Sequence, residues 1–325
     1  MSTIDVISPG IQSTVQDADG RVGHRRRGFS LSGPCDAYAL RAANLCVGND
    51  AGQAAIEIPM GRFTATVLRP CVVAVTGADE TPASLNGETF PSWEGVLADA
   101  GDELEISTVR GPGFRAYLAV TGGIDVPQRL GSRSTHTRAH LGGFQGRPLR
   151  RGDLLSTGGG AQVRRRVPLV SRPTYASEWE IEVVKGPYAD PDYLTAADWE
   201  LMTSATWRID LNSDRSGTRL VGPRFAWARS DGGDGGAHPS NMVDGPYPRG
   251  GVLMNGDVPT ILGPDSPVSG GFVTIATVPR SALWKVGQLR PGTDTVRFRE
   301  VSPEQSARMA AAQDAQLTAN AMEEL

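Results

Sequence analysis

Residues suited to chemistry gather in a polar, glycine-rich stretch from Asn212 to Phe272. Its centre, WARSDGGDGGAHPSN at 227–241, sets carboxylate, imidazole and amide side chains among glycines. Glycine lets the backbone approach a ligand closely, and loops held by a rigid scaffold are where binding and catalytic residues concentrate. Such side chains can donate hydrogen bonds to a developing oxyanion or orient the N–H groups of a small polar substrate. A set of ordinary β-turns has the same composition, so the pattern alone leaves both interpretations open.

A second polar loop, LGSRSTHTRAHLGGFQGR at 130–147, follows the segment GGIDVP at 122–127. Arg133 in this loop could offer a planar fork to a carboxylate or polarise a ureido oxygen. Anchoring the loop to backbone carbonyls explains this arginine equally well. His136 and His140 lie close together in the loop, but Zn or Ni needs three or four converging ligands. We therefore predict no metal site.

A third polar segment, residues 13–36, is long for a loop without a function. It leads into the first predicted helix, residues 34–47, which Ser32 or Gly33 would cap. Asp36 at this junction either caps the helix, where its charge also favours the N-terminal dipole, or contacts a substrate. The sequence leaves both roles open.

Strands dominate the elements that must position these loops. Asn86-Gly87 is a strong hairpin signal. Short apolar runs between Gly, Pro, Asn and Asp residues predict the other strands. The expected strands are 56–58, 63–68, 71–75, 104–109, 114–120, 180–184, 207–211, 252–254, 259–262 and 272–278. The sequence therefore predicts a mainly β chain.

Helical signals are few and short. Thr195 and Asp198 form a capping-box pattern at the start of a predicted helix, residues 195–204. A short helix is expected at 279–287, where Lys285 fits either a surface ion pair or a place in the site. The tail from Ser302 begins with a second capping-box pattern and predicts a helix outside the barrel elements.

Composition excludes several classes of function. The 325 residues carry a formal net charge of −4, which does not suggest a nucleic-acid or anionic-membrane partner. The three cysteines, Cys35, Cys46 and Cys71, are odd in number and lack metal-ligand spacing, so we expect reduced thiols, with Cys46 and Cys71 buried. No signal peptide or membrane span is apparent. We expect a cytoplasmic protein.

Long motifs in this chain resemble one family. The segments TVQD, GGIDVP with LGSRST, WAR-x-DGG-x-x-G-x-HPSN, GD-x-P-x-ILGPD and LWK-x-GQL all follow its pattern. The chain is similar to the allophanate hydrolase subunit 2 family, which includes the C component of 5-oxoprolinase. It looks most like the carboxyltransferase domain of biotin-dependent urea carboxylase. The resemblance runs from near residue 6 to near residue 301.

The resemblance implies a fold of two cyclophilin-like β-barrel domains with a few short helices. The expected boundaries are 1–160 for the N-terminal barrel, 161–301 for the C-terminal barrel and 302–325 for a helical tail. It also implies pairing with a subunit 1 homologue and with a biotin carboxylase and carrier subunit. Biotin would be carried on another polypeptide, because this sequence holds no biotin-attachment motif and no ATP-binding loop.

The function implied is carboxyl transfer from carboxybiotin to urea or a related small amide or guanidino compound. We expect the catalytic donors to be Arg133, His238 and Asn241. The expected substrate-binding residues are Asp36, Asp231, Asp234, Asp257, Asp265 and Lys285. Asp234 and the run 266–269 depart from the family pattern, so the sequence leaves the substrate open.

Two alternatives stay beside this interpretation. One is the C component of an ATP-dependent 5-oxoprolinase, which works without biotin. The other is a non-enzymatic regulatory binding module with the same fold. Amidase-type hydrolysis by this chain alone is not expected, because no Ser-Ser-Lys arrangement surrounds Lys185 or Lys285 and no GxSxG motif is present.

Overall fold

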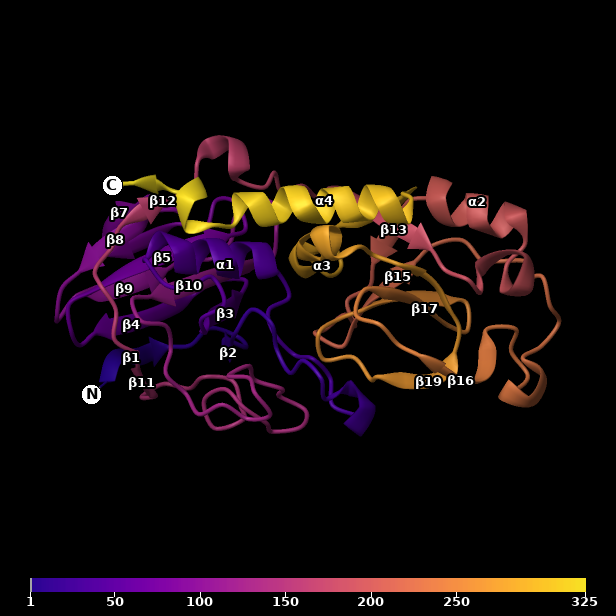
Figure 1. The fold of residues 1–325 in the computed structure, drawn as a ribbon, viewed down its shortest axis with the longest axis horizontal. Coiled ribbons are helices and arrows are strands. Elements are labelled where there is room, and N and C mark those ends of the chain that lie inside the picture. The colour runs from indigo at the N-terminus through magenta and orange to yellow at the C-terminus, as the bar shows by residue number, and fades with distance from the viewer. Residues whose placement is uncertain (1) are drawn as a thin grey trace. The chain divides into compact units, whose positions relative to one another are not determined.

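The structure is a computed structural model that describes residues 2–325 (Figure 1). The chain divides into two compact units. The first comprises Met1–Val22, Ser32–Tyr175 and Gln313–Leu325, and the second comprises Gly23–Leu31 and Ala176–Ala312. The main boundary between the two units therefore lies between residues 175 and 176. In addition, residues 23–31 belong to the second unit and residues 313–325 belong to the first.

The first unit contains two sheets around one apolar core. The six-stranded sheet runs, in spatial order, β11 (Leu154–Ser156), β1 (Ser2–Ser8), β4 (Phe63–Val67), β9 (Glu103–Ile106), β6 (Ala83–Leu85) and β7 (Glu88–Phe90). The five-stranded sheet runs β2 (Thr14–Gln16), β3 (Ala55–Pro59), β10 (Arg115–Val120), β5 (Cys71–Gly77) and β8 (Gly95–Ala98). Alternate residues such as Phe63, Ala65 and Val67 of β4 are fully buried in this core, as expected for a sheet with one covered face.

The sequence predicted most of these strands, and the structure confirms them with small shifts at the ends. The Asn86-Gly87 hairpin is also confirmed, with φ of 52° and 85° at its two turn residues. Both residues are thus left-handed, as a two-residue turn that follows the strand twist requires. The strand expected at 104–109 is shorter than predicted and ends at Ile106.

The first helix, α1 (Ala37–Cys46), packs against β5 and β10 (Figure 1). The capping role predicted for Asp36 is confirmed, whereas the cap predicted at Ser32 or Gly33 was wrong. Asp36 is the N-cap, and its Oδ1 accepts a hydrogen bond from the Ala39 N–H at 2.9 Å. An N-cap carboxylate satisfies a helix N–H and also favours the helix dipole.

The second unit is built on a closed barrel of seven strands. Their order is β13 (Glu178–Lys185), β20 (Thr274–Thr277), β17 (Gly251–Asn255), β18 (Val258–Leu262), β15 (Gly217–Val221), β14 (Trp207–Ile209) and β21 (Thr295–Glu300). A separate ribbon pairs β16 (Asn241–Pro246) with β19 (Ser269–Phe272). The single strand expected at 272–278 is instead two strands, because the ladder breaks at Val273. The prediction of a mainly β fold with few helices is confirmed.

The helices of the second unit are short. α2 (Ala196–Ser204) begins with the predicted capping box of Thr195 and Asp198, which is confirmed. α3 (Leu283–Gln288) follows a 3-10 turn, η5 (Arg280–Ala282). The other short turns are η1 (Arg25–Arg27), η2 (Leu169–Ser171), η3 (Ala189–Tyr193, a π-helix), η4 (Gly233–Gly235) and η6 (Ala319–Ala321).

The tail forms α4 (Pro303–Gln316), and its predicted capping box is present. The Ser302 N–H donates to Gln305 Oε1 at 2.7 Å, and the Gln305 N–H donates to Ser302 Oγ at 3.2 Å. Beyond the helix, β22 (Glu323–Glu324) pairs with β12 (Arg165–Arg166) in the first unit. The chain end is thus tied into a sheet, which the sequence did not predict.

The three cysteines are free and buried, and the burial predicted for Cys46 and Cys71 is confirmed. Burial raises the pKa of the Cys46 thiol to about 12 and that of Cys71 to about 11. Both behave as small apolar core residues. None of the helices within residues 2–325 is long and apolar enough to cross a membrane.

Candidate functional site

The glycine-rich segment 227–241 of the second unit is positioned from its first residue by Asp198. This carboxylate accepts the N–H groups of Ala226 at 2.7 Å and Trp227 at 3.1 Å, in addition to its bonds in the capping box of α2. Trp227 has a φ of 63°, which is uncommon for a bulky residue and persists only where the surroundings fix it. Asp198 therefore fixes the conformation from which the Trp227 side chain projects.

The charge on Asp198 is stabilised where it lies. Burial alone would raise the pKa of Asp198, but hydrogen bonds from Ala226, Thr195 and Trp227 outweigh burial and hold this pKa below its usual value. A buried carboxylate that accepts several N–H bonds stays ionised. The backbone at the start of segment 227–241 is thus held by hydrogen bonds to an ionised Asp198 carboxylate.

Trp227, His238 and Asp257 form a cluster in this unit. The Trp227 Nε1–H donates to Asp257 Oδ1 at 3.0 Å, and His238 Nε2 lies 3.7 Å from the same oxygen. The indole and imidazole rings meet edge to face with centroids 5.5 Å apart. The side chains of His238 and Asp257 are 37% and 35% exposed, so a ligand can reach both. The structure therefore brings together two of the predicted site residues.

The other side of the His238 ring faces Ser240. The Ser240 N–H donates to His238 Nδ1 at 3.1 Å, and Ser240 Oγ lies 2.9 Å from the same nitrogen. Ser240 is fully buried, and its carbonyl accepts the Val273 N–H at 2.9 Å. The His238 imidazole is thus held by Ser240, whose own backbone is buried and hydrogen-bonded to Val273.

Asp231, Asp234 and Asn241 lie on the same segment as His238. Asp231 Oδ1 accepts the Gly233 N–H at 2.9 Å, and Asp234 lies exposed in η4. Asn241 begins β16, and a Cβ added at Gly236 would lie 2.5 Å from its Nδ2. The glycine in this turn therefore leaves room for the Asn241 amide.

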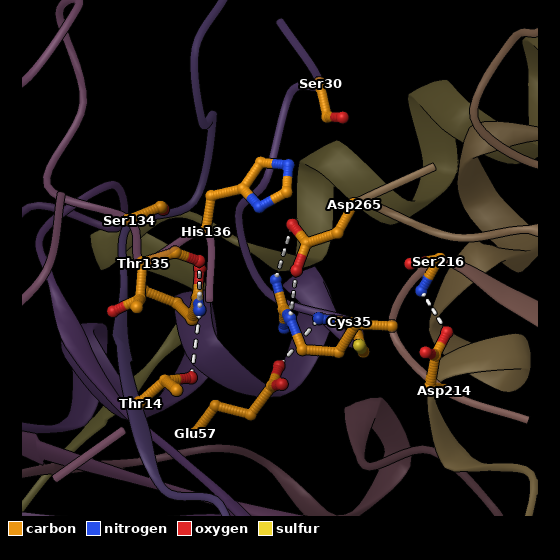
Figure 2. A network of polar contacts seen from close by, with 12 residues as sticks. Thr14, Ser30, Cys35, Glu57, Ser134, Thr135, His136, Asp214, Ser216 and Asp265 are labelled. Carbon is orange, nitrogen blue, oxygen red and sulfur yellow. Dashed lines mark hydrogen bonds and ion pairs between the residues drawn. The ribbon is translucent and has the colours of Figure 1, made fainter. Parts of the chain in front are cut away.

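Asp265 and Lys285 lie in ion pairs elsewhere in the second unit. Asp265 is buried, and its two oxygens accept from Arg215 Nε at 2.8 Å and Nη2 at 3.4 Å (Figure 2). Lys285 Nζ donates to Glu182 Oε2 at 2.9 Å and to the Glu180 carbonyl at 2.9 Å. These pairs tie loops and strands of the barrel together, and we do not place either residue in the proposed site.

The ion pair of Lys285 is coupled to a buried charge. Burial would raise the pKa of Glu182, but the hydrogen bond and charge of Lys285, together with the charge of Arg299, hold it below its usual value. Removing one partner of such a pair leaves an uncompensated buried charge. Lys285 is thus explained by its structural contacts.

Asp36 is fully buried in the first unit and caps α1, as described above. Its neighbour Cys35 donates its N–H to Glu57 Oε2 at 2.7 Å (Figure 2). The Tyr117 hydroxyl donates to the same oxygen at 2.7 Å and accepts the Asp36 N–H at 2.8 Å. Asp36 is therefore held inside a polar network that fixes the start of α1.

Arg133 lies in a loop that is tied to β2 through Asp17. The Asp17 carboxylate accepts the hydroxyls of Ser132 at 2.7 Å and Ser134 at 2.6 Å, together with the Arg133 N–H. The TVQD and LGSRST motifs therefore form one structural unit. The Arg133 side chain, 35% exposed, pairs with Asp125 at 3.2 Å and lines a cavity of about 500 Å³ in the first unit.

Three residues of the second-unit cluster escaped the sequence analysis as site residues: Asp198, Trp227 and Ser240. The capping-box pattern identified Asp198 only as a helix cap, and no local signal announces a left-handed tryptophan. Ser240 follows His238 by two residues, which is a common spacing with no motif value. No group of three or more His, Cys, Asp or Glu residues suited to a metal ion occurs within 2–325.

Comparison with known proteins finds one matching family and several similar proteins. The family described as "Carboxyltransferase domain, subdomain A and B" matches residues 27–300. Urea amidolyase of Saccharomyces cerevisiae is 40% identical over 321 residues, which are 96% of this chain and 17% of that protein. The C component of Haemophilus influenzae 5-oxoprolinase is 32% identical over 314 residues, 94% of each chain. The crystal structure of Kluyveromyces lactis urea carboxylase superimposes with a TM-score of 0.92 at 36% identity, over 99% of this chain and 30% of that one.

Proposed function

This chain belongs to the carboxyltransferase domain family, and on that premise we propose that it is the carboxyltransferase component of a biotin-dependent, urea-carboxylase-like enzyme. The reaction would move the carboxyl group of carboxybiotin to a nitrogen of urea or a related small amide or guanidino compound. The observation that carries the proposal is the likeness to urea amidolyase, at 40% identity, against 32% for the C component of 5-oxoprolinase.

The proposed activity needs more than the residues of this chain. The chain spans 17% of the length of the urea amidolyase that it matches. Its sequence holds no biotin-attachment motif and no ATP-binding loop. We therefore propose that a biotin carboxylase and carrier, with a subunit 1 homologue, complete the activity.

The cluster in the second unit supplies the groups that a small amide requires. His238 offers an N–H, and Asp257 offers a carboxylate oxygen 3.7 Å away, with both side chains about one-third exposed. The N–H would hold the substrate carbonyl oxygen, and the carboxylate would orient a substrate N–H toward transfer. Preorganised donors and acceptors of this kind are the usual largest contribution to catalysis.

The first unit supplies a group suited to biotin. The ureido ring of biotin has one strong acceptor oxygen, and the Arg133 guanidinium beside the cavity could polarise it. When bound, carboxybiotin supplies the carboxyl group, which moves to the substrate nitrogen while a proton of that nitrogen moves the other way. Arg133 would stabilise negative charge on the ureido oxygen of a biotin bound at the cavity of the first unit.

The test is reconstitution of the full chain with its subunit 1 homologue, a biotin carboxylase and a biotin carrier. Labelled bicarbonate and ATP are added with urea, guanidinium or 5-oxoproline. The proposal predicts acid-labile label fixed only when urea, another small amide or guanidinium is present. Biotin-independent ATP hydrolysis with 5-oxoproline, without fixation of label, would overturn it.

The C component of 5-oxoprolinase is the second candidate because it aligns with 94% of this chain at 32% identity. The alignment covers 94% of this chain and 94% of that protein, whereas urea amidolyase is far longer. The same reconstitution separates the two activities, because only the first requires biotin.

A further inference from the structure

The two contacts from Ser240 fix which nitrogen of His238 carries the proton. A backbone N–H can only donate, so His238 Nδ1, 3.1 Å from the Ser240 nitrogen, must accept. The tautomer is assigned here from this hydrogen bond. With Nδ1 accepting, a neutral imidazole carries its proton on Nε2, the nitrogen that faces Asp257.

The second contact strengthens the same assignment. Ser240 Oγ lies 2.9 Å from Nδ1, and its hydroxyl can donate to the lone pair there. Ser240 is fully buried, and its carbonyl is bonded to Val273 between β19 and β20. The backbone of Ser240, which carries the N–H that donates to Nδ1, is therefore held by the strand connection.

Asp257 supplies a fixed acceptor beside this fixed donor. Trp227 holds Asp257 Oδ1 at 3.0 Å. The 3.7 Å between His238 Nε2 and Asp257 Oδ1 is longer than a good hydrogen bond. Among residues 2–325, no hydrogen-bond donor is bonded to Asp257 Oδ2. The pair therefore keeps one donor and one acceptor for a ligand.

We propose that Ser240 is a specificity-determining positioning residue: by fixing the Nε2–H tautomer of His238 it makes the cluster select the C=O and N–H edge of an amide over an all-donor guanidinium. This inference rests on the proposed function and narrows its substrate class to urea and small amides. An amide satisfies both groups at once. A guanidinium can donate to the Asp257 carboxylate, but it has no acceptor for the His238 Nε2–H. The two N–H groups would then face each other, and that donor would stay unsatisfied.

The direct test is nuclear magnetic resonance of the full chain with ¹⁵N-labelled histidine. The chain has four histidines, so the His238 signals can be assigned with a His238→Ala sample. At pH 8 we expect the shifts of a protonated Nε2 and an unprotonated Nδ1. In Ser240→Ala the backbone N–H of residue 240 still donates to Nδ1 and only the hydroxyl is lost, so the Nδ1 shift should move part of the way toward the average of exchanging tautomers. A protonated Nδ1 in the unaltered chain would overturn the inference.

The selectivity is tested on the same samples with low-millimolar urea and guanidinium chloride. Urea should shift the His238 Nε2 signal more strongly than guanidinium does. Ser240→Ala should reduce this preference by roughly three- to tenfold, the range for one neutral hydrogen bond. Equal or stronger binding of guanidinium to the unaltered chain, or an unchanged preference in Ser240→Ala, would contradict the proposal.

Two variants separate positioning from folding. Ser30→Ala removes another buried hydroxyl of the second unit, which donates to the Ser266 carbonyl at 2.6 Å, and should leave the His238 signals and the preference unchanged. Ser240→Thr keeps a hydroxyl and should restore the tautomer. These readouts need no partner protein. A reconstituted enzyme that fixes no label while the tautomer and preference hold would count against the proposed function alone.

Discussion

At the scale of the residue, His238 is defined by what surrounds it. Ser240 holds one ring nitrogen, Asp257 faces the other, and Trp227 meets the ring edge to face. None of these contacts can be read from the tripeptide His-Pro-Ser. The sequence supplied the residue type and the loop, and the tertiary fold supplies the direction of its N–H group.

His238→Ala tests this residue most simply. Removing one preorganised hydrogen-bond donor from an oxyanion typically lowers kcat by roughly a hundred- to a thousandfold. We expect a loss of that size in label fixation by the reconstituted enzyme, with an unchanged melting temperature because the side chain is partly exposed. His140→Ala, an exposed histidine of the first unit, is the matched control and should retain activity. Full activity of His238→Ala would remove this residue from the site.

The predicted site residues separate into two kinds. Four of them lie on the glycine-rich segment of the second unit, and Asp257, in the turn between β17 and β18, lies beside His238. Asp36, Asp265 and Lys285 are explained by capping and ion pairing. Sequence patterns mark both kinds alike, because a structural carboxylate and a substrate-binding one occur in the same turns. Burial and partners distinguish them.

At the scale of the element, local signals were reliable where the chemistry is local. The Asn86-Gly87 turn and the capping boxes at Thr195 and Ser302 depend on residues within four positions of one another. The sequence predicted a cap of α1 at Ser32 or Gly33 and also a capping role for Asp36, because several candidate residues precede the helix. Choosing among them depends on where Glu57 and Tyr117 hold the backbone, which no local pattern encodes.

Asp198 links α2 to the site and yields a stability prediction. Asp198→Asn removes a charged acceptor from several N–H and O–H donors, so the free energy of unfolding at pH 7 should fall by about 2–3 kcal/mol. Its pKa is lowered in the folded state from the ordinary 3.8, so its contribution is present above that pH and is lost as the pH falls through the lower folded value.

Thermal melts of Asp198→Asn at pH 7 and near pH 3 check the size of the loss in stability and the direction in which it changes with pH. The difference from the unaltered chain should shrink in acid. Glu200→Gln, an exposed carboxylate on the same helix, should change stability by less than about 0.5 kcal/mol at either pH. A difference for Asp198→Asn that grows toward acid would contradict the account.

At the scale of the whole molecule, the sequence did not predict which strands pair when their residues lie far apart along the chain. β1 pairs with β11 through Ile4 and Leu155, and β12 pairs with the chain end. Such contacts close long loops, and their partners are not specified by spacing or composition. The residue pattern predicted a β-rich chain, and the family resemblance implied two barrel domains. The assignment of 23–31 to the second unit and of 313–325 to the first required the structure.

The central claim is that this chain directs a carboxyl group onto the nitrogen of a small amide. The most direct measurement supplies ¹³C-bicarbonate and ¹⁵N-urea to the reconstituted enzyme and follows the ¹³C spectrum. The account predicts a carboxyl signal split by a bonded ¹⁵N, formed only with ATP, the biotin carrier and this chain together. Carboxylated carrier that accumulates without any ¹³C–¹⁵N coupling, in the presence of this chain, would contradict it.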